Sequence, residues 1–474
     1  MSNTQTEIKR PNRRLRSGER KALLMTGDIL VTLLALVIAV IVWAVDDWLT
    51  FSIEFLQVRI PFWFFLLPIL WILLLTELYD ERRAARRSET LRGVAIAAGI
   101  SFVLYLVVYF TSDPTSLPRR GVAVFIGAAA ILTLLWRFLY IRIFTTSEFM
   151  RRVLIVGAGR AGSKLAKIIQ GIYPPPFYLV GLIDDDPGKE GETIAGYPIL
   201  GTGRQLLEIV EKEEVTDIIF AISVEMNPVL FRSLIEAEEM GIEVTTMPAV
   251  YEELLKRVPI TLLQSDWIIR QFFDVVPTGG LYELAKRLMD IMGALVGMFG
   301  LAVIYPPVAL AILLDSGFPI FYSQDRLGKN GQVYKIFKFR TMRQNAEEDG
   351  EARLASENDT RITRVGRFLR KSHLDEFPQF FNVLRGDMSL TGPRAEQVEL
   401  VNILQEEVPF YRARLLVKPG LTGWAQVNYG YAATVAQTII KLEYDLYYIK
   451  HRNLWLDLTI LFRTVGTVVG FRGQ

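Results

Sequence analysis

The chain contains no cysteine and only two histidines, His373 and His451, among its 474 residues. The lack of cysteine excludes disulfide bonds and thiol nucleophiles, and two histidines leave little material for a zinc site. The formal net charge is +2, so close to zero that nothing indicates nucleic-acid binding. We therefore expect no nucleic-acid partner and no chemistry carried by sulfur.

Hydrophobic residues make up 51% of the sequence, so the chain is too apolar for an ordinary soluble protein and too long for one core. The first 150 residues contain four apolar segments, each near the length that a membrane-spanning helix requires. They lie at residues 23–45, 60–78, 93–110 and 121–144. The first has no small-residue cleavage site and precedes further spans, so we do not expect a signal peptide. The pattern predicts a four-helix transmembrane bundle over residues 1–150.

Basic residues in the connections predict the orientation of this bundle. The N-terminal tail, the loop at residues 82–87 and the exit at Arg151 and Arg152 are basic. The connections at residues 46–57 and 111–117 carry no lysine or arginine. Because basic loops stay in the cytoplasm, we expect both ends of the bundle to be cytoplasmic.

From residue 153 the sequence alternates short buried strands with helices, which indicates an α/β domain. Strands are predicted at residues 153–156, 179–183, 217–222 and 242–247, with a helix at 163–170. Gly157, Gly159 and Gly162 follow the first strand and Asp184 follows the second, as in dinucleotide-binding folds. We predict a Rossmann-like domain over residues 151–270 with these four residues as possible nucleotide ligands. The same glycines could instead serve only close helix–strand packing.

A fifth apolar segment, about residues 288–314, contains Pro306 and Pro307 past its middle. A straight helix of this length would reach roughly 40 Å and cross the membrane. Crossing would place the α/β domain and the sequence around Asp375 on opposite sides of the membrane, although each is expected in the cytoplasm. Because two prolines can break a helix, we predict a re-entrant membrane helix that enters and leaves by one face, with a kinked full span as the alternative.

Two adjacent carboxylates, Asp375 and Glu376, lie in a region rich in arginine. A carboxylate can act as a nucleophile or hold a divalent cation, while guanidinium groups bind phosphate oxygens, so this combination favours phosphoryl transfer. Ser372 and Asp375 could instead form a helix capping box. A helix that begins at Ser372 would contain Pro378 in its interior, at a cost of roughly 3 kcal/mol. We therefore expect the helix to begin near Asp375 instead.

From about residue 281 onward, the sequence resembles the monotopic phosphoglycosyl transferases, bacterial sugar transferases that initiate glycan assembly. The resemblance is carried by the segment with two prolines and by the motifs at residues 335–342, 372–382, 392–394 and 418–428. The whole chain resembles the large form of this family, the polyprenyl-phosphate hexose-1-phosphate transferases. The resemblance implies a membrane protein of α plus α/β class whose monotopic catalytic domain occupies residues 281–474.

The family's activity is the transfer of a hexose-1-phosphate from a UDP-sugar to undecaprenyl phosphate, which releases UMP and begins bacterial polysaccharide synthesis. The resemblance makes Asp375 the nucleophile that forms a covalent phosphosugar intermediate and lies near Mg²⁺, with Glu376 as its acid–base partner. Four basic residues are expected to hold phosphate oxygens: Lys338, Arg340, Arg370 and Arg394. The implied location is the bacterial inner membrane, in contact with lipid, with the catalytic domain on the cytoplasmic face. We also expect a homo-oligomer, a dimer.

Two other functions fit parts of the sequence. A membrane-anchored NAD-dependent nucleotide-sugar dehydratase or epimerase could share the N-terminal spans, and Tyr282 and Lys286 have the spacing of its Tyr-x-x-x-Lys pair. That enzyme needs a second dinucleotide fold, and no new glycine-rich motif precedes Tyr282. The non-enzymatic alternative is a membrane sensor or scaffold that binds nucleotide at residues 157–162.

Overall fold

The computed structural model describes the following residues: 17–45, 47, 49–79, 84, 86–111, 119–144, 150–173, 175–222, 227–262, 280–343, 361–430, 432 and 434–469. The chain forms two compact units, Met1–Met247 and Pro248–Gln474. Most of the basic N-terminal tail, and parts of the connections used to predict orientation, lie outside the described residues. The orientation therefore stays a prediction.

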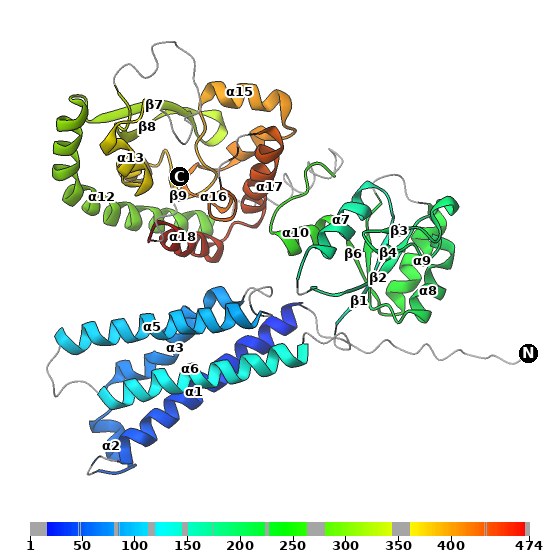
Figure 1. The fold of residues 1–474 in the computed structure, drawn as a ribbon, viewed down its shortest axis with the longest axis horizontal. Coiled ribbons are helices and arrows are strands. Elements are labelled where there is room, and N and C mark those ends of the chain that lie inside the picture. The colour runs from blue at the N-terminus through cyan, green and yellow to red at the C-terminus, as the bar shows by residue number, and fades with distance from the viewer. Residues whose placement is uncertain are drawn as a thin grey trace, which may run out of the picture. The chain divides into compact units, whose positions relative to one another are not determined.

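The first unit begins with a bundle of apolar helices, which Figure 1 shows side by side. Its main helices are α1 (Ser17–Val45), α3 (Leu67–Leu74), α5 (Arg87–Thr111) and α6 (Arg119–Phe144). In α1, α5 and α6 the apolar stretch is long enough to cross a membrane. Leucine, isoleucine and valine side chains remain exposed on their outer faces, as lipid contact requires. The predicted membrane class is confirmed.

The second predicted span is not one regular helix. After the short helix α2 (Ile53–Val58), it consists of the 3₁₀ turn η1 (Phe62–Leu66), then α3, then the 3₁₀ turn η2 (Thr76–Tyr79). Proline explains the first two starts, because Pro61 precedes η1 and Pro68 lies in the first turn of α3, where a missing N–H costs little. The 3₁₀ turns rise about 2.0 Å per residue and α3 about 1.5 Å, so the lengths of the three pieces add up to about 30 Å.

One ion pair is buried inside this bundle and ties its helices together. Arg137 of α6 lies 2.7 Å from Asp28 of α1, and these side chains are 1% and 0% exposed. Arg137 also donates to the carbonyl of Leu78 in η2 at 3.1 Å. Charges at membrane depth persist only when paired, so this contact helps to fix how the three elements pack.

The rest of the first unit is the α/β domain, and its four predicted strands and first helix are confirmed. The strands β1 (Arg152–Val156), β2 (Tyr178–Ile183), β5 (Asp217–Phe220) and β6 (Glu243–Thr246) form a parallel sheet in the order β2-β1-β5-β6. The helices are α7 (Arg160–Gln170), α8 (Leu206–Lys212) and α9 (Pro228–Glu239), and a small hairpin joins β3 (Thr193–Ile194) to β4 (Tyr197–Pro198). After β1 the chain adds β2 on one side of β1, and it later adds β5 on the other side. The glycine loop after β1 therefore lies where the strand order switches sides, which is where ligands bind in such folds.

The second unit begins earlier than the predicted start of the catalytic domain at residue 281. Helix α10 (Met247–Leu255) packs within this unit, where the Tyr251 hydroxyl donates to Glu443 at 3.0 Å. The Trp424 indole N–H donates to the carbonyl of Lys256 at 2.9 Å. The boundary between the two units therefore lies before the expected end of the middle domain at residue 270.

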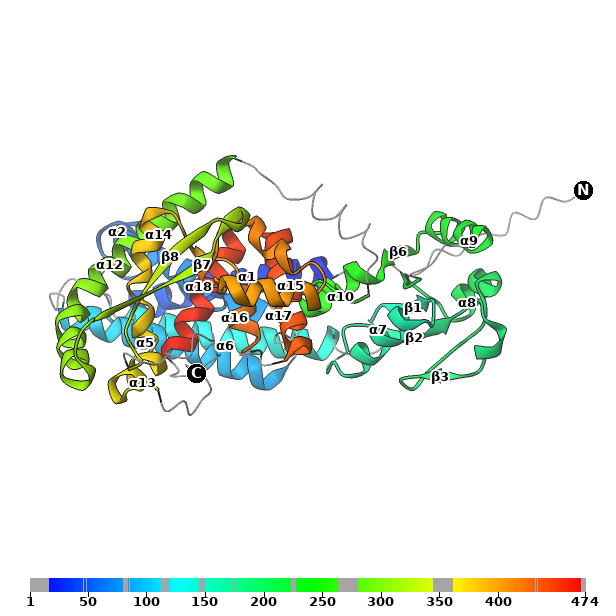
Figure 2. The ribbon, with the colours of Figure 1, turned by 90° about the horizontal axis from the view of Figure 1, so that it is seen from above.

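The second unit is built from a long helix, a two-stranded ribbon and several shorter helices. After α12 (Gly280–Ser316), β7 (Phe321–Leu327) and β8 (Val333–Phe339) form the antiparallel ribbon seen in Figure 2. The helices that follow are α13 (Arg364–Lys371), α14 (Gln379–Arg385), α15 (Val398–Glu407), α16 (Trp424–Asn428), α17 (Val435–His451) and α18 (Leu454–Val469). The short strands β9 (Ser389–Thr391) and β10 (Gly420–Thr422) pair in parallel.

Helix α12 contains Pro306 and Pro307 inside an unbroken helical segment, so the prolines do not end the helix as expected. Figure 1 shows instead that α12 bends. Near its start, Asp290 accepts hydrogen bonds from the Ser389 hydroxyl and the Leu390 N–H at 2.9 Å each. At its end, Asp315 accepts from the Val365 N–H at 2.9 Å. A straight helix of 37 residues would be about 55 Å long, and the bend keeps both ends against the same unit.

Candidate active site

The two adjacent carboxylates lie in a short turn between α13 and α14. Ser372 ends α13, and its hydroxyl donates to the Phe368 carbonyl at 2.9 Å, so the capping box considered for Ser372 is wrong. His373 then adopts a left-handed conformation with φ of 57°, and a 3₁₀ turn, η7 (Leu374–Glu376), follows directly. A 3₁₀ turn thus lies at Asp375, but the α-helix itself begins later than expected, at Gln379, with Pro378 as its N-cap. Both carboxylates therefore precede the N-terminus of a helix, where the peptide dipoles favour negative charge.

Helix α14 is fixed against the strand that supplies a cation to the site. Asn382 is fully buried, accepts a hydrogen bond from the Phe337 N–H at 3.2 Å and donates to the Lys335 carbonyl at 2.8 Å. This double contact sets the register between α14 and β8. It places Lys338, on β8, beside the turn that carries Glu376.

Glu376 is held by two cations from distant parts of the sequence. One carboxylate oxygen, Oε1, lies 2.7 Å from the Lys338 ammonium and 2.6 Å from the Arg394 guanidinium. Burial alone would raise the pKa of Glu376, but the positive charges of Arg394 and Lys338 and their hydrogen bonds bring it well below its usual range. Glu376 is therefore a carboxylate at neutral pH.

Asp375 lies in a different environment although it adjoins Glu376. Its side chain is 8% exposed, and within the described part of the chain no group donates a hydrogen bond to its carboxylate. Burial, followed by the negative charge of Glu376, raises the pKa of Asp375 to about 6, against the opposing charges of Lys338, Arg370 and Arg394. Neighbouring carboxylates whose pKa values are separated in this way are typical of catalytic pairs.

The structure brings Arg370 to this site but not Arg340. The Arg370 Nε donates to the Thr341 hydroxyl at 3.0 Å, and its charge acts on Asp375. Arg340 points elsewhere and donates to the carbonyls of Ser316, the last residue of α12, and of Gly317 and Phe318, which follow it. Its side chain is buried in that contact. Arg340 therefore anchors the end of α12 in this structure, and its expected phosphate-binding role stays a prediction.

A small pocket opens beside Glu376. Its polar walls come from Arg326, Lys338, Gln379 and Arg394, and its apolar walls include Ile336, Met388 and Leu421. Neither Arg326 nor Gln379 was predicted to belong to the site. Gln379 follows Glu376 by three residues, so the spacing at which helical neighbours share a face could have identified it.

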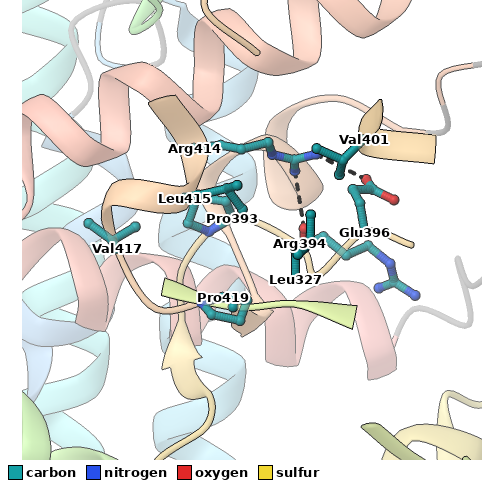
Figure 3. Close-up of a pocket in the computed structure, with 10 residues that line it drawn as sticks. Leu327, Pro393, Arg394, Glu396, Val401, Arg414, Leu415, Val417 and Pro419 are labelled. Carbon is teal, nitrogen blue, oxygen red and sulfur yellow. Dashed lines mark hydrogen bonds and ion pairs between the residues drawn. The ribbon is translucent and has the colours of Figure 1, made fainter. Parts of the chain in front are cut away.

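The backbone of Arg394 is held by a buried ionic network around Arg414, and Figure 3 shows the contacts of Arg414 with Arg394 and Glu396. The Arg414 guanidinium donates to the backbone carbonyl of Arg394 at 3.1 Å and pairs with Glu396 at 3.3 Å and with Asp445 at 2.9 Å. Just before Arg394, a Cβ at Gly392 would lie 2.5 Å from the carbonyl oxygen of Lys418, so only glycine allows the approach of these two segments. The Gly-Pro-Arg motif thus fixes the backbone from which Arg394 reaches Glu376.

The tyrosine and lysine that suggested a dehydratase hold a buried carboxylate instead. The Tyr282 hydroxyl donates to Asp457 at 3.0 Å, and the Lys286 ammonium lies 3.0 Å from the other oxygen of the same side chain. The Tyr448 hydroxyl also donates to Asp457, at 2.8 Å, and Asp457 is fully buried. Nothing in this arrangement favours the dehydratase, because both groups are already used to join α12 to α17 and α18.

The glycine loop of the α/β domain brings its four predicted residues together. Gly157 has a positive φ of 106°, and a Cβ at Gly162 would lie 1.9 Å from the Gly157 carbonyl oxygen. Asp184 accepts from the Ala158 N–H at 2.7 Å and pairs with Lys189 at 3.0 Å. Burial alone would raise the pKa of Asp184, but these hydrogen bonds lower it. Its carboxylate already serves the loop, so a ribose would have to share it.

Comparison with known proteins finds one family match in each unit. The chain matches the family described as "Bacterial sugar transferase" over residues 281–471 and the family described as "CoA-binding domain" over residues 74–248. The first match contains every candidate catalytic residue. The second contains the glycine loop.

Curated relatives agree with the first match. A UDP-N-acetylgalactosamine-undecaprenyl-phosphate N-acetylgalactosaminephosphotransferase from Aeromonas hydrophila is 44% identical over 46% of this chain and 51% of its own length. A UDP-glucose:undecaprenyl-phosphate glucose-1-phosphate transferase from Xanthomonas campestris pv. campestris is 33% identical over 58% of this chain and 57% of its own. A protein of the latter name from Caulobacter vibrioides is 40% identical over 40% of this chain and 70% of its own. The chain thus spans a little over half the length of the first two relatives.

Proposed function

Because the chain belongs to the bacterial sugar transferase family, we propose that it transfers a hexose-1-phosphate from a UDP-sugar to undecaprenyl phosphate and releases UMP. The observation that carries the proposal is the pair of adjacent carboxylates with separated pKa values beside Lys338 and Arg394. The undecaprenyl-phosphate sugar transferases named above support the substrate classes. The product would begin the assembly of a bacterial polysaccharide.

In the first step, a carboxylate oxygen of Asp375 attacks the phosphorus that bears the sugar. The bond from this phosphorus to the bridging oxygen breaks, UMP leaves, and an acyl phosphate joins the phosphosugar to Asp375. In the second step, a phosphate oxygen of undecaprenyl phosphate attacks the same phosphorus and frees Asp375. Asp375 must be ionised to attack, and its pKa of about 6 leaves most of it ionised at neutral pH.

The basic residues lower the barrier by neutralising charge. An anionic nucleophile approaches an anionic diphosphate, and this repulsion would make the attack slow without cations at the site. Lys338 and Arg394 are held by Glu376 where they can turn to the diphosphate oxygens, and Arg370 adds its charge beside Asp375. With the cations on the substrate, Glu376 can accept the proton of a singly protonated acceptor phosphate.

We also propose that Mg²⁺ binds with the substrate at Asp375. Within the described ranges, no cluster of three or more histidine, aspartate or glutamate side chains is arranged to hold a metal ion. Mg²⁺ needs fewer protein ligands, because it commonly uses one or two carboxylates together with substrate phosphates. The buried carboxylate of Asp375 suits this role, and the ion would neutralise charge on the diphosphate.

The proposed place of the enzyme is the cytoplasmic face of the inner membrane, with α12 as a re-entrant helix. Two features support re-entry. Both ends of α12 contact the second unit, through Asp290 and Asp315. Between them, Met292, Phe299 and Leu310 expose 58–74% of their surface, as lipid-facing side chains do.

The α/β domain is proposed to be a Rossmann-like module outside the chemistry. The parallel sheet with a glycine loop at its switch point supports nucleotide or coenzyme binding there. Every residue assigned to the transfer lies after residue 281. The domain should therefore affect assembly or regulation and leave the reaction itself unchanged.

The direct test is to incubate the purified protein and undecaprenyl phosphate with a panel of UDP-sugars while UMP is measured. We expect UMP with at least one UDP-hexose, and none from the Asp375→Asn variant. A change in nicotinamide absorbance without UMP would instead indicate a dehydratase. If no sugar gives UMP or a change in nicotinamide absorbance, the proposal is contradicted.

A further inference from the structure

Gln379 is a buried polar residue whose side-chain amide nitrogen has no hydrogen-bond partner among the described residues. It is the first residue of α14 and is 3% exposed. Its amide nitrogen, Nε2, is buried and makes no hydrogen bond to any described residue. Buried donors are almost always satisfied, and an unsatisfied one destabilises the fold. Such a group calls for an acceptor that the ligand-free protein does not supply.

The pocket that Gln379 lines is rich in donors and poor in acceptors. Lys338, Arg326 and Arg394 contribute positive charge, and Glu376 is the one acidic side chain among the described residues that line it. Lys338 and Arg394 already share a single oxygen of that carboxylate. The Nε of Arg326 is a second buried nitrogen without a partner in the described structure. A ligand that complements this pocket must bring several acceptor oxygens and negative charge.

We propose that Gln379 is a substrate-binding residue whose amide N–H groups donate to an oxygen of the diphosphate. This inference rests on the proposed function and adds a residue to its site. A diphosphate has acceptor oxygens but no donors, so it fits a wall of one amide and three cations. A further cation at this position would pair with Glu376. A neutral amide does not form such an ion pair, and it fixes the direction of one hydrogen bond. Gln379 thus helps the site to recognise the diphosphate.

Equilibrium binding separates this role from a structural one. We would measure by calorimetry the binding of UDP, with Mg²⁺, to the unmodified protein, because UDP carries no hexose-1-phosphate to transfer, and use uridine as the probe without phosphate. Adding Gln379→Leu should weaken UDP binding about ten- to a hundredfold, the range for a hydrogen bond to a charged group. Uridine binding should not change. Gln405→Leu is the matched control, because Gln405 accepts a surface hydrogen bond from Arg412.

The substrate-binding role and a structural role predict different changes in the melting temperature. Leucine removes the unsatisfied donor, so the ligand-free Gln379→Leu protein should melt at the same temperature or higher, while its stabilisation by UDP shrinks. A structural glutamine would instead lower the melting temperature. If leucine does not fold, Gln379→Glu keeps the shape and adds negative charge, and it should bind UDP more weakly than its parent.

The outcomes distinguish the inference from the function on which it rests. Three outcomes would overturn the inference alone. Gln379→Leu could leave UDP affinity unchanged, or it could weaken UDP and uridine binding equally. The third outcome is a Gln379→Glu protein that binds UDP as tightly as its parent. Failure of the parent protein to bind UDP would overturn the proposed function together with it.

Discussion

Acidification from about pH 7 to about pH 5 should slow the attack of Asp375 about tenfold. The structure raises the pKa of Asp375 to about 6, first by burial and then by the charge of Glu376. About nine tenths of a group with this pKa is ionised at pH 7 and about one tenth at pH 5. Only the ionised carboxylate attacks phosphorus, so the rate should rise with pH through about 6 and level off above about 7.

The assay has to isolate the first step, because a phosphate monoester such as the lipid acceptor also titrates near pH 6. The diphosphate of a UDP-sugar carries no proton in this range. We would therefore omit the acceptor and measure the initial burst of UMP at a subsaturating concentration of UDP-sugar. Under this condition the pH dependence reports the free enzyme.

The variant Glu376→Gln tests the cause of the raised pKa. It removes the neighbouring negative charge, so the midpoint of the remaining burst rate should move below about pH 6, even though the rate itself falls. A burst rate that stays constant down to pH 5 in the unmodified protein would refute the reasoning. A midpoint that Glu376→Gln leaves in place would assign the shift to burial alone.

Three further outcomes follow from the geometry. Gly159→Val should leave the transferase activity of folded protein unchanged, because Gly159 has an ordinary φ and open space around its Cβ position; loss of activity by folded protein would contradict the modular account. Arg340→Met should lower thermal stability by about 3 kcal/mol through the carbonyls left unpaired at the end of α12, whereas unchanged stability would refute its anchoring role. Replacing Pro306 and Pro307 by leucine should straighten α12 and abolish transfer, and a single cysteine at Asn330 should then react from the opposite face of sealed vesicles; labelling from an unchanged face would contradict the role of the prolines in the bend.

The parts of the fold that depend on hydrophobic pattern were predictable from the sequence. The strands β1, β2 and β5 are short, mostly buried apolar runs beside a turn, whereas β6 is polar and only partly buried and is recognised by its place after a helix. The break-up of the second span was not predicted, because an average over its apolar residues hides the separate starts at Pro61 and Pro68. The bend of α12 likewise depends on how its two ends are held by residues far away in sequence.

The site was predictable where charge and spacing carry the information. Asp375, Glu376 and Arg394 stand in motifs whose chemistry is visible in the residues themselves. The place of Arg340 was not predictable, because a guanidinium suits phosphate and helix-end carbonyls equally, and only the folded chain shows its contacts with the carbonyls. Gln379 carries no charge, so its importance appears only when burial and the missing partner are known.

The most direct test of the account is mass spectrometry of protein that has been given only a UDP-sugar and Mg²⁺. We predict an adduct of phosphohexose mass on the peptide that contains Asp375, formed together with UMP and absent from Asp375→Asn. Addition of undecaprenyl phosphate should remove the adduct. UMP that forms only when the acceptor is present, with no adduct on Asp375, would contradict the covalent intermediate and establish direct transfer between the two substrates.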